Sequence, residues 1–253
     1  MIKIAIYGKG GIGKSTTAAN VSAALAKGGM KVMQIGCDPK SDSTQTLAGR
    51  NVPTVLDAIR AHGTDLSLDE LVFPGAFGVR CVEAGGPTPG VGCAGRGIIT
   101  AFETLARLQA FETYQPDVVI YDVLGDVVCG GFAMPIRDGY AKDVFIVTSG
   151  EKMALYAAGN IALAIDHFKD RGYARCAGLI LNSRDVQDEQ SKVAQLADTL
   201  GTAVVGIIPR DGLVQQAEAL GQTVAQAFPD SPLAHGYQAL AANIVSLCGK
   251  DAA

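Results

Sequence analysis

The chain has 253 residues, 48% of them hydrophobic, and its formal net charge is -4. This size suits one large α/β domain or two small ones with a substantial core. The acidic balance and the lack of a basic tract argue against general nucleic-acid binding, and no apolar run reaches the roughly 18–20 residues of a membrane span.

The N-terminal segment carries no pattern of a charged, then apolar, then small-residue stretch. We therefore expect no secretory signal and a cytoplasmic protein. In a reducing cytoplasm the six cysteines are expected to be free thiols or metal ligands rather than disulfides.

Short apolar runs alternate with longer amphipathic segments along the chain. Strands are predicted at 2–7, 31–35, 79–82, 117–121, 144–148, 177–181 and 204–208. Helices are predicted at 15–27, 97–111, 153–171, 187–200, 212–220 and 232–247. This alternation favours a mostly parallel sheet with helices on both faces. Because no linker, repeat or low-complexity segment interrupts it, we expect a single α/β domain over residues 1–253.

Between the first strand and the first helix, residues 8–15 fit the phosphate-binding pattern G-x-x-x-x-G-K-S/T. Its glycines allow backbone N–H groups to surround phosphate oxygens, and the helix N-terminus adds a positive dipole end. A glycine-rich turn without a ligand is the alternative. We expect Lys14 to reach the outer phosphates and Ser15 to bind Mg²⁺. The predicted nucleotide contacts in this segment are Gly8, Lys9, Gly10, Gly11, Ile12, Gly13, Lys14, Ser15 and Thr16.

Lys9 is an additional lysine inside this loop, and a solvated surface charge is its simplest interpretation. The pattern G-K-G-G-x-G-K-S/T nevertheless resembles the deviant Walker A loop of septum-site, plasmid-partition and nitrogenase reductase ATPases. In that family the early lysine reaches the nucleotide of the other subunit. The resemblance therefore implies a nucleotide-sandwich dimer in which Lys9 stabilises the transition state of phosphoryl transfer.

Aspartates follow two of the predicted strands. Carboxylates at this position face the crevice in which α/β sheets bind ligands. We expect Asp122 to hold Mg²⁺ directly or through water and Asp38 to orient the attacking water, with Asp42 and Asp126 placed to sense the γ-phosphate. The alternative for a single strand-end aspartate is a helix cap or a turn, and for Lys40 it is a solvated charge.

Two cysteines, Cys93 and Cys129, are flanked by glycine and small apolar residues, and each precedes a predicted helix start. Backbone N–H groups there can donate to cluster sulfurs. A four-iron cluster takes four thiolates, and a two-fold dimer supplies two from each chain. A zinc site of two thiolates from each chain also fits. Cys37 is undecided, and the remaining cysteines are interpreted as small buried hydrophobes: Cys81, Cys176 and Cys248.

Four segments, 7–17, 36–40, 89–97 and 121–135, resemble the nitrogenase iron protein family, and the resemblance runs from Ile2 to about Leu247. It implies a P-loop ATPase fold, a homodimer, and one 4Fe–4S cluster held by Cys93 and Cys129 of both chains. It further implies that MgATP hydrolysis drives one electron into a partner catalytic metalloprotein, with a ferredoxin or flavodoxin as upstream donor. Neither nucleic acid nor a membrane is an expected partner.

The same resemblance implies further site residues. Asn182 and residues 209–215 match the region of the family that contacts the nucleotide base, so Asn182, Pro209, Asp211 and Gln215 are expected contacts, in addition to Lys40 and Asp42 nearer the phosphates. Arg96 matches an arginine that docks on the partner and that some organisms ADP-ribosylate.

The chain ends at Ala253, whereas nitrogenase iron proteins usually continue into a C-terminal tail. We therefore favour a nitrogenase-like reductase component of the methylthio-alkane type, with nitrogenase proper a close second. The run Cys93-Ala94-Gly95-Arg96 resembles nitrogenase and its closest relatives more than the tetrapyrrole reductases. The competing functions are a positioning ATPase of the partition or septum-site type and an iron–sulfur assembly ATPase.

Overall fold

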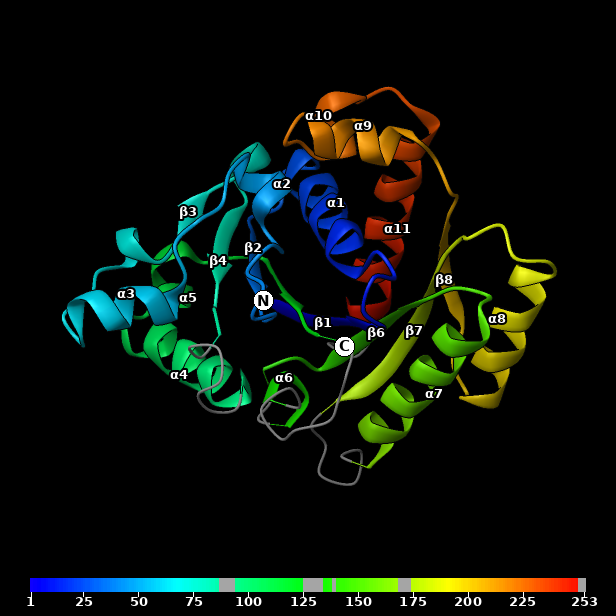
Figure 1. The fold of residues 1–253 in the computed structure, drawn as a ribbon, viewed down its shortest axis with the longest axis horizontal. Coiled ribbons are helices and arrows are strands. Elements are labelled where there is room, and N and C mark those ends of the chain that lie inside the picture. The colour runs from blue at the N-terminus through cyan, green and yellow to red at the C-terminus, as the bar shows by residue number, and fades with distance from the viewer. Residues whose placement is uncertain (87–93, 125–133, 138–139, 168–173, 250–253) are drawn as a thin grey trace.

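The computed structural model describes residues 1–86, 94–124, 134–137, 140–167 and 174–249 (Figure 1). Within these ranges eight strands form one sheet in the order β3-β4-β2-β5-β1-β6-β7-β8. The pair β3–β4 is antiparallel, and the other neighbouring pairs are parallel. The strands are β1 (Ile2–Gly8), β2 (Val32–Gly36), β3 (Phe73–Pro74), β4 (Arg80–Glu83), β5 (Val118–Asp122), β6 (Asp143–Thr148), β7 (Arg175–Asn182) and β8 (Val204–Ile208).

Helices connect the strands and form a layer on each face of the sheet. The first helices are α1 (Lys14–Lys27), α2 (Gln45–Ala48), α3 (Val55–His62), α4 (Ala94–Arg107), α5 (Ala110–Tyr114) and α6 (Met134–Arg137). The later ones are α7 (Lys152–Asp166), α8 (Glu189–Thr199), α9 (Leu213–Ala219), α10 (Val224–Ala227) and α11 (Pro232–Gly249). Two short 3₁₀ turns, η1 (Leu68–Glu70) and η2 (Ala76–Gly78), lie beside β3.

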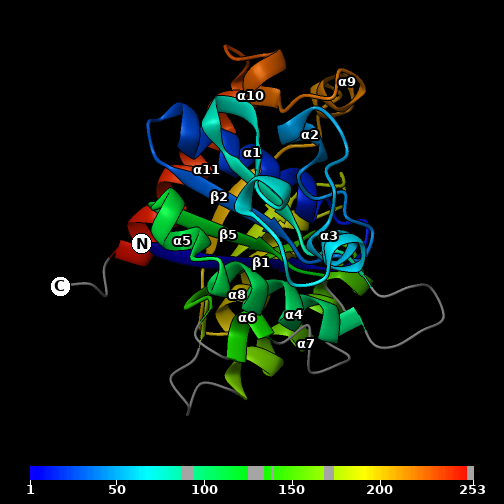
Figure 2. The ribbon, with the colours of Figure 1, turned by 90° about the vertical axis from the view of Figure 1, so that its left-hand side faces the viewer.

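The alternating side chains of the strands divide the core between the two faces. On β1, Ala5 and Tyr7 pack with α3 to α8, whereas Ile4 and Ile6 pack with α1, α2 and α9 to α11. Figure 2 shows these two helix layers on opposite sides of the sheet. The period of two along each strand places apolar residues on both faces, which a parallel sheet covered by helices requires.

The predicted strands are all present, with small differences at their ends. The helix predicted over 97–111 is wrong as a single element, because Gln109 adopts a left-handed φ of 57° and separates α4 from α5. Helix α7 ends at Asp166 rather than Arg171, and 168–173 lie outside the described residues. The prediction missed the short elements α2, α3, α6, α10 and β3. In the described part of the chain, no helix combines the length and apolarity needed to cross a bilayer.

Candidate nucleotide site

The phosphate-binding loop joins the central strand β1 to α1, as the motif requires. Gly11 and Gly13 have φ angles of 74° and 92°, a region that side-chain-bearing residues rarely adopt. The Ile12 N–H donates to the Lys9 carbonyl at 3.1 Å, which closes the turn, and the Thr17 N–H donates to the Gly13 carbonyl at 2.9 Å, which begins the helix. The loop thus has the curled backbone expected for phosphate binding.

Side chains from the end of β7 hold this loop from outside. The Asn182 amide donates to the Ile12 carbonyl at 2.6 Å, and the Arg184 guanidinium donates to the Gly11 carbonyl at 2.9 Å. A Cβ on Gly13 would collide with the Asn182 amide. Asn182 therefore contacts the loop itself, in addition to lying beside the cavity.

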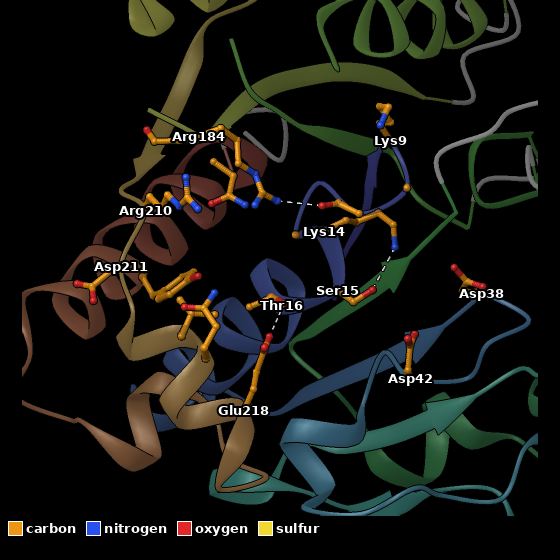
Figure 3. Close-up of a pocket in the computed structure, with 18 of the residues that line it drawn as sticks. Lys9, Lys14, Ser15, Thr16, Asp38, Asp42, Arg184, Arg210, Asp211 and Glu218 are labelled. Carbon is orange, nitrogen blue, oxygen red and sulfur yellow. Dashed lines mark hydrogen bonds between the residues drawn. The ribbon is translucent and has the colours of Figure 1, made fainter. Parts of the chain in front are cut away.

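A cavity of about 480 Å³ opens beside the loop. It runs between the phosphate-binding loop, the segment after β2 and the segment after β8, and Figure 3 shows the charged side chains around it. The predicted residues that line it are Lys9, Gly10, Gly11, Gly13, Lys14, Ser15, Thr16, Asp38, Lys40, Asp42, Asn182, Pro209, Asp211 and Gln215. The structure therefore brings together residues that are far apart in sequence, at the edge where parallel strands end.

Three predicted contacts do not line the cavity. Gly8 and Ile12 are buried under the loop, where a Cβ on Gly8 would lie 2.6 Å from the Val147 carbonyl oxygen. Asp122 is fully buried at the end of β5. Its Oδ1 accepts a hydrogen bond from the Lys14 ammonium at 2.5 Å, and its Oδ2 has no partner among the described residues.

Lys14 is also within 3.3 Å of the Ser15 hydroxyl (Figure 3). The ammonium group thus lies between a buried carboxylate and the hydroxyl that is predicted to bind Mg²⁺. Because Asp122 retains a free, buried acceptor atom, this corner of the site suits a further cation or donor. The predicted role of Asp122 toward Mg²⁺ stays a prediction.

The segment after β2 brings two acids to the cavity. Asp38 is buried, and its Oδ1 accepts a hydrogen bond from the Lys40 N–H at 3.0 Å, while Asp42 is exposed. Ser41 between them has a left-handed φ of 55°. In Figure 3 both carboxylates lie on the side of the cavity nearest Ser15.

Sequence reasoning included Arg210 and Val214 only as members of the range 209–215, and it missed five other residues that line the cavity: Leu124, Ser183, Arg184, Glu218 and Tyr237. The position of Arg184, two residues beyond the end of β7, is a signal that could have identified it. Glu218 offered no such signal, because it reaches the site from α9, where its carboxylate accepts a hydrogen bond from the Thr16 hydroxyl at 2.9 Å (Figure 3).

The side chains that line the cavity suit MgATP. Its basic side chains suit phosphate groups, and these are Lys9, Lys14, Lys40, Arg184 and Arg210. The Ser15 hydroxyl and the acids Asp38 and Asp42 supply the oxygen ligands that Mg²⁺ prefers. When bound, Mg²⁺ supplies charge neutralisation for the transferring phosphoryl group.

Asp126 and the two predicted cluster ligands, Cys93 and Cys129, lie outside the described residues. Helix α4 begins at the residue after Cys93, α6 begins five residues after Cys129, and these two helices pack against each other. This packing of the flanking helices is compatible with one cluster that takes a ligand from each segment.

The cysteines that the structure describes lie in or against the core. Cys37 and Cys81 are fully buried, and burial raises the pKa of the Cys81 thiol to about 12. Burial, followed by the nearby Asp122 and Glu83 carboxylates, also raises the pKa of Cys37 well above its ordinary value. These environments favour neutral thiols over the thiolates that ligate metals. Cys176 and Cys248 are partly buried against the core.

Residues 2–249 match the model of a family described as 4Fe-4S iron sulfur cluster binding proteins, NifH/frxC family. A nitrogenase iron protein from Methanospirillum hungatei JF-1 is 57% identical over 250 residues, which cover 97% of this chain and 88% of that protein. The chain belongs to this family.

The solved structures that resemble this NifH-family chain show its fold. The cell division ATPase MinD of Pyrococcus furiosus superposes with a TM-score of 0.73 at 19% identity, over 97% of this chain and 99% of that chain. A ParA family ATPase from Chlorobium tepidum TLS gives a TM-score of 0.73 at 21% identity, over 95% and 98%. The predicted P-loop fold with a mostly parallel sheet is confirmed.

Family membership also fixes the general biochemistry. Members of this family are ATP-hydrolysing oxidoreductase components that bind a 4Fe–4S cluster and MgATP, and this chain is a member of the family. The family works as a homodimer with a catalytic partner component. The predicted family, enzyme class and cofactors are thereby confirmed.

Proposed function

We propose that this NifH-family protein is the ATP-dependent electron donor of a cytoplasmic nitrogenase-like system. Two copies share one 4Fe–4S cluster through Cys93 and Cys129 of each chain. MgATP hydrolysis in the cavity is coupled to the transfer of one electron to a catalytic metalloprotein. A ferredoxin or flavodoxin then supplies a new electron that re-reduces the cluster, and neither nucleic acid nor a membrane takes part.

The observation that carries this proposal is the family match over residues 2–249 together with a cavity whose residues suit MgATP. The positioning ATPases share the fold at 19–21% identity, which supports no transfer of their activity. The buried environments of Cys37 and Cys81 support the assignment of the cluster to the glycine-flanked Cys93 and Cys129.

The proposal gives five residues of the site a role in hydrolysis. Lys14 and Ser15 hold the outer phosphates and Mg²⁺, with Asp122 beside them. Asp38 orients the attacking water. Lys9 is exposed and stands apart from the other labelled side chains in Figure 3. Such a lysine is free to act on the nucleotide of a second copy.

We propose two candidate catalytic partners, in order of preference. A methylthio-alkane-reducing partner is the first candidate, and the run Cys93-Ala94-Gly95-Arg96, which resembles nitrogenase and its closest relatives, supports it over a tetrapyrrole-reducing partner. Nitrogenase proper is the second, and the 57% identity to a nitrogenase iron protein is the observation that favours it.

The ligand assignment is tested by anaerobic purification of the wild type and of Cys129→Ser. We expect a brown dimer with about four irons in the wild type, and loss of the cluster spectrum with retained MgATP binding in the variant. Cys176→Ala, which changes a partly buried core thiol, is the matched control and should keep the cluster. A four-iron spectrum in Cys129→Ser would refute the assignment.

The acceptor is tested by trapping the complex. MgADP with aluminium fluoride mimics the transferring phosphoryl group, so it should lock the dimer onto its catalytic partner in a pull-down from the native organism. Identification of the partner then separates the two candidate systems. Capture of DNA or lipid in place of a metalloprotein would contradict the proposal.

A further inference from the structure

The segment that carries Asp38, Lys40 and Asp42 is anchored at its far end by buried polar contacts outside the cavity. Residues 43 and 44 are at most 1% exposed, whereas Asp42 is exposed. Two side chains from neighbouring strands, Gln34 on β2 and Glu83 on β4, hold this buried end. Each makes two hydrogen bonds to it.

Gln34 is the first anchor and is fully buried. Its amide nitrogen lies 2.9 Å from both the carbonyl oxygen and the hydroxyl oxygen of Ser43. Its amide oxygen accepts a hydrogen bond from the Ser22 hydroxyl at 2.7 Å. Because Ser22 is in α1, the helix that the phosphate-binding loop begins, one side chain links that helix to the segment with the two acids.

Glu83 is the second anchor and is also fully buried. Its Oε1 accepts hydrogen bonds from the Thr44 N–H at 2.6 Å and from the Thr44 hydroxyl at 2.7 Å. The other oxygen, Oε2, has no partner among the described residues. Glu83 is the register partner of Gly36, and a Cβ on Gly36 would collide with its carboxyl group.

Burying a polar group at such a position costs free energy, so we look for a contribution that an apolar side chain could not make. Gln34 and Glu83 belong to the face of the sheet that otherwise packs an apolar cluster with α1. A buried amide or carboxyl group pays a desolvation penalty that its hydrogen bonds only roughly offset. Hydrogen bonds are directional, so these bonds hold backbone and side-chain atoms of residues 43 and 44 in defined positions against the rigid sheet.

We propose that Gln34 and Glu83 are positioning residues for the nucleotide reaction, which hold the segment 37–44 so that Asp38 and Asp42 keep their places beside Ser15. This inference rests on the proposed function of the cavity. Neither Gln34 nor Glu83 lines the cavity.

The physical reason is that attack on a phosphate is sensitive to small displacements of the residues that orient the water and the metal. A misplacement of about 1 Å can cost roughly 100-fold in rate. Gln34 lies in β2, just before the segment begins, and its side chain bonds to Ser43 at the other end of the segment. Replacing Gln34 should therefore loosen the segment while Asp38 and Asp42 themselves stay unchanged. The phosphate-binding loop is held separately by Asn182 and Arg184.

The test compares Gln34→Met with Ser22→Ala in the anaerobically purified holoprotein. Gln34→Met keeps an unbranched side chain of similar volume but loses both bonds to Ser43. Ser22→Ala breaks one bond to the same Gln34 and leaves both bonds to Ser43 in place. We measure kcat and KM for MgATP, the ratio of MgATP to MgADP affinity by calorimetry, and amide exchange of residues 41–44.

For Gln34→Met we expect kcat to fall about 10- to 100-fold with KM within about threefold. Discrimination between MgATP and MgADP should narrow, and the amides of 41–44 should exchange faster. Ser22→Ala should stay within about threefold of the wild type in kcat. Thr44→Val, which removes one of the two bonds to Glu83, supplies a second, smaller disturbance of the same segment and should shift the same quantities in the same direction.

Unchanged kcat and unchanged exchange in Gln34→Met would overturn the inference. So would an equal loss in Ser22→Ala, because the effect would then come from the core rather than from the segment. If Gln34→Met does not fold, Thr44→Val decides on the same readouts. The iron content of the wild type and its electron transfer to the trapped partner test the proposed function separately. A failure of the inference about Gln34 and Glu83 can therefore be distinguished from a failure of the proposed function.

Discussion

At the scale of single residues, the site depends on a few positions whose surroundings restrict which residue type can occupy them. Gly13 has a positive φ and no room for a Cβ beside Asn182. Asp122 holds Lys14 with one carboxylate oxygen and has a second buried oxygen without a partner. Glu83 is a buried acid that accepts two hydrogen bonds from Thr44. Each is constrained by contacts at the carboxyl ends of the strands.

Glu83 gives a pH-dependent prediction. Burial raises its pKa from the ordinary 4.5 to about 8, against the opposing effect of the Thr44 hydrogen bonds, and the Asp122 and Asp42 carboxylates raise it further. The folded protein therefore keeps a proton that the unfolded chain loses between about pH 4.5 and about pH 8. The stabilising contribution of Glu83 is therefore fully present below this window, and the free energy of unfolding falls as the pH rises through it.

Glu83→Gln keeps a carbonyl acceptor for Thr44 and cannot ionise. We expect its unfolding free energy to fall less than that of the wild type between pH 5.5 and 8.5, with a gap at the upper end on the order of a few kcal/mol. Thermal unfolding of both proteins across this range is the measurement. Parallel curves for the two proteins would show that Glu83 is ionised in the fold throughout.

At the scale of elements, the helices follow the expected periodicity except where local backbone geometry intervenes. The apolar pattern over 97–111 is continuous, yet Gln109 turns the chain into the left-handed region and starts α5 in a new direction. Helix α3 begins at a capped residue, because the Thr54 hydroxyl accepts a hydrogen bond from the Asp57 N–H at 3.0 Å. Capping of this kind fixes short helices that periodicity alone does not detect.

Helix α11 gives a prediction about stability. Gly236 lies inside this helix, and a Cβ added there would meet no atom within 4 Å. Gly236→Ala should therefore stabilise the protein by about 1 kcal/mol, because alanine loses less backbone entropy on folding. Urea unfolding provides the measurement. Gly178→Ala is the contrasting variant, since its Cβ would collide with Val205, and it should destabilise.

At the scale of the whole molecule, the homodimer makes the proposed chemistry possible. One chain offers two glycine-flanked cysteines and an exposed Lys9, and each is useful only opposite a second copy. If the cluster and both nucleotides lie at the dimer interface, then a rigid-body movement of the subunits couples hydrolysis to electron transfer.

Lys9→Ala tests the contribution of the second copy. ATP should still bind, because the remaining basic residues of the cavity are intact, but hydrolysis should fall by about 100-fold or more. Small-angle scattering should also show no compaction of the dimer with MgATP. Lys27→Ala changes an exposed lysine at the far end of α1 and should behave as the wild type. Normal hydrolysis by Lys9→Ala would mean that the lysine does not act across the dimer.

Arg96→Glu tests the docking surface. Arg96 is exposed in the first turn of α4, next to the Cys93 segment in sequence. We expect weaker binding to the catalytic partner, by about 10-fold or more, with the cluster spectrum of the isolated dimer unchanged. Arg107→Glu makes the same charge change at the opposite end of the same helix. If both variants lose binding equally, the effect is one of net charge and not of docking.

The fold class, the phosphate-binding loop, the family and most residues of the cavity could be predicted from the sequence. Those features are local, because a strand, a glycine-rich turn and a helix start are written in consecutive residues. Asp38 and Asp42 were identified because each follows a predicted strand and parallel strands end at one edge, whereas Asn182 was identified from the resemblance to the family.

Only the tertiary structure decided which side chains meet. It paired Lys14 with Asp122 across 108 positions of sequence, brought Glu218 to Thr16 from α9, and joined Ser22, Gln34 and Ser43 beneath the site. Such contacts depend on strand order and register, and in a crossover sheet neither is set by adjacent residues. Spacing along the chain therefore predicted the catalytic loops, whereas packing between distant elements determined how those loops are held.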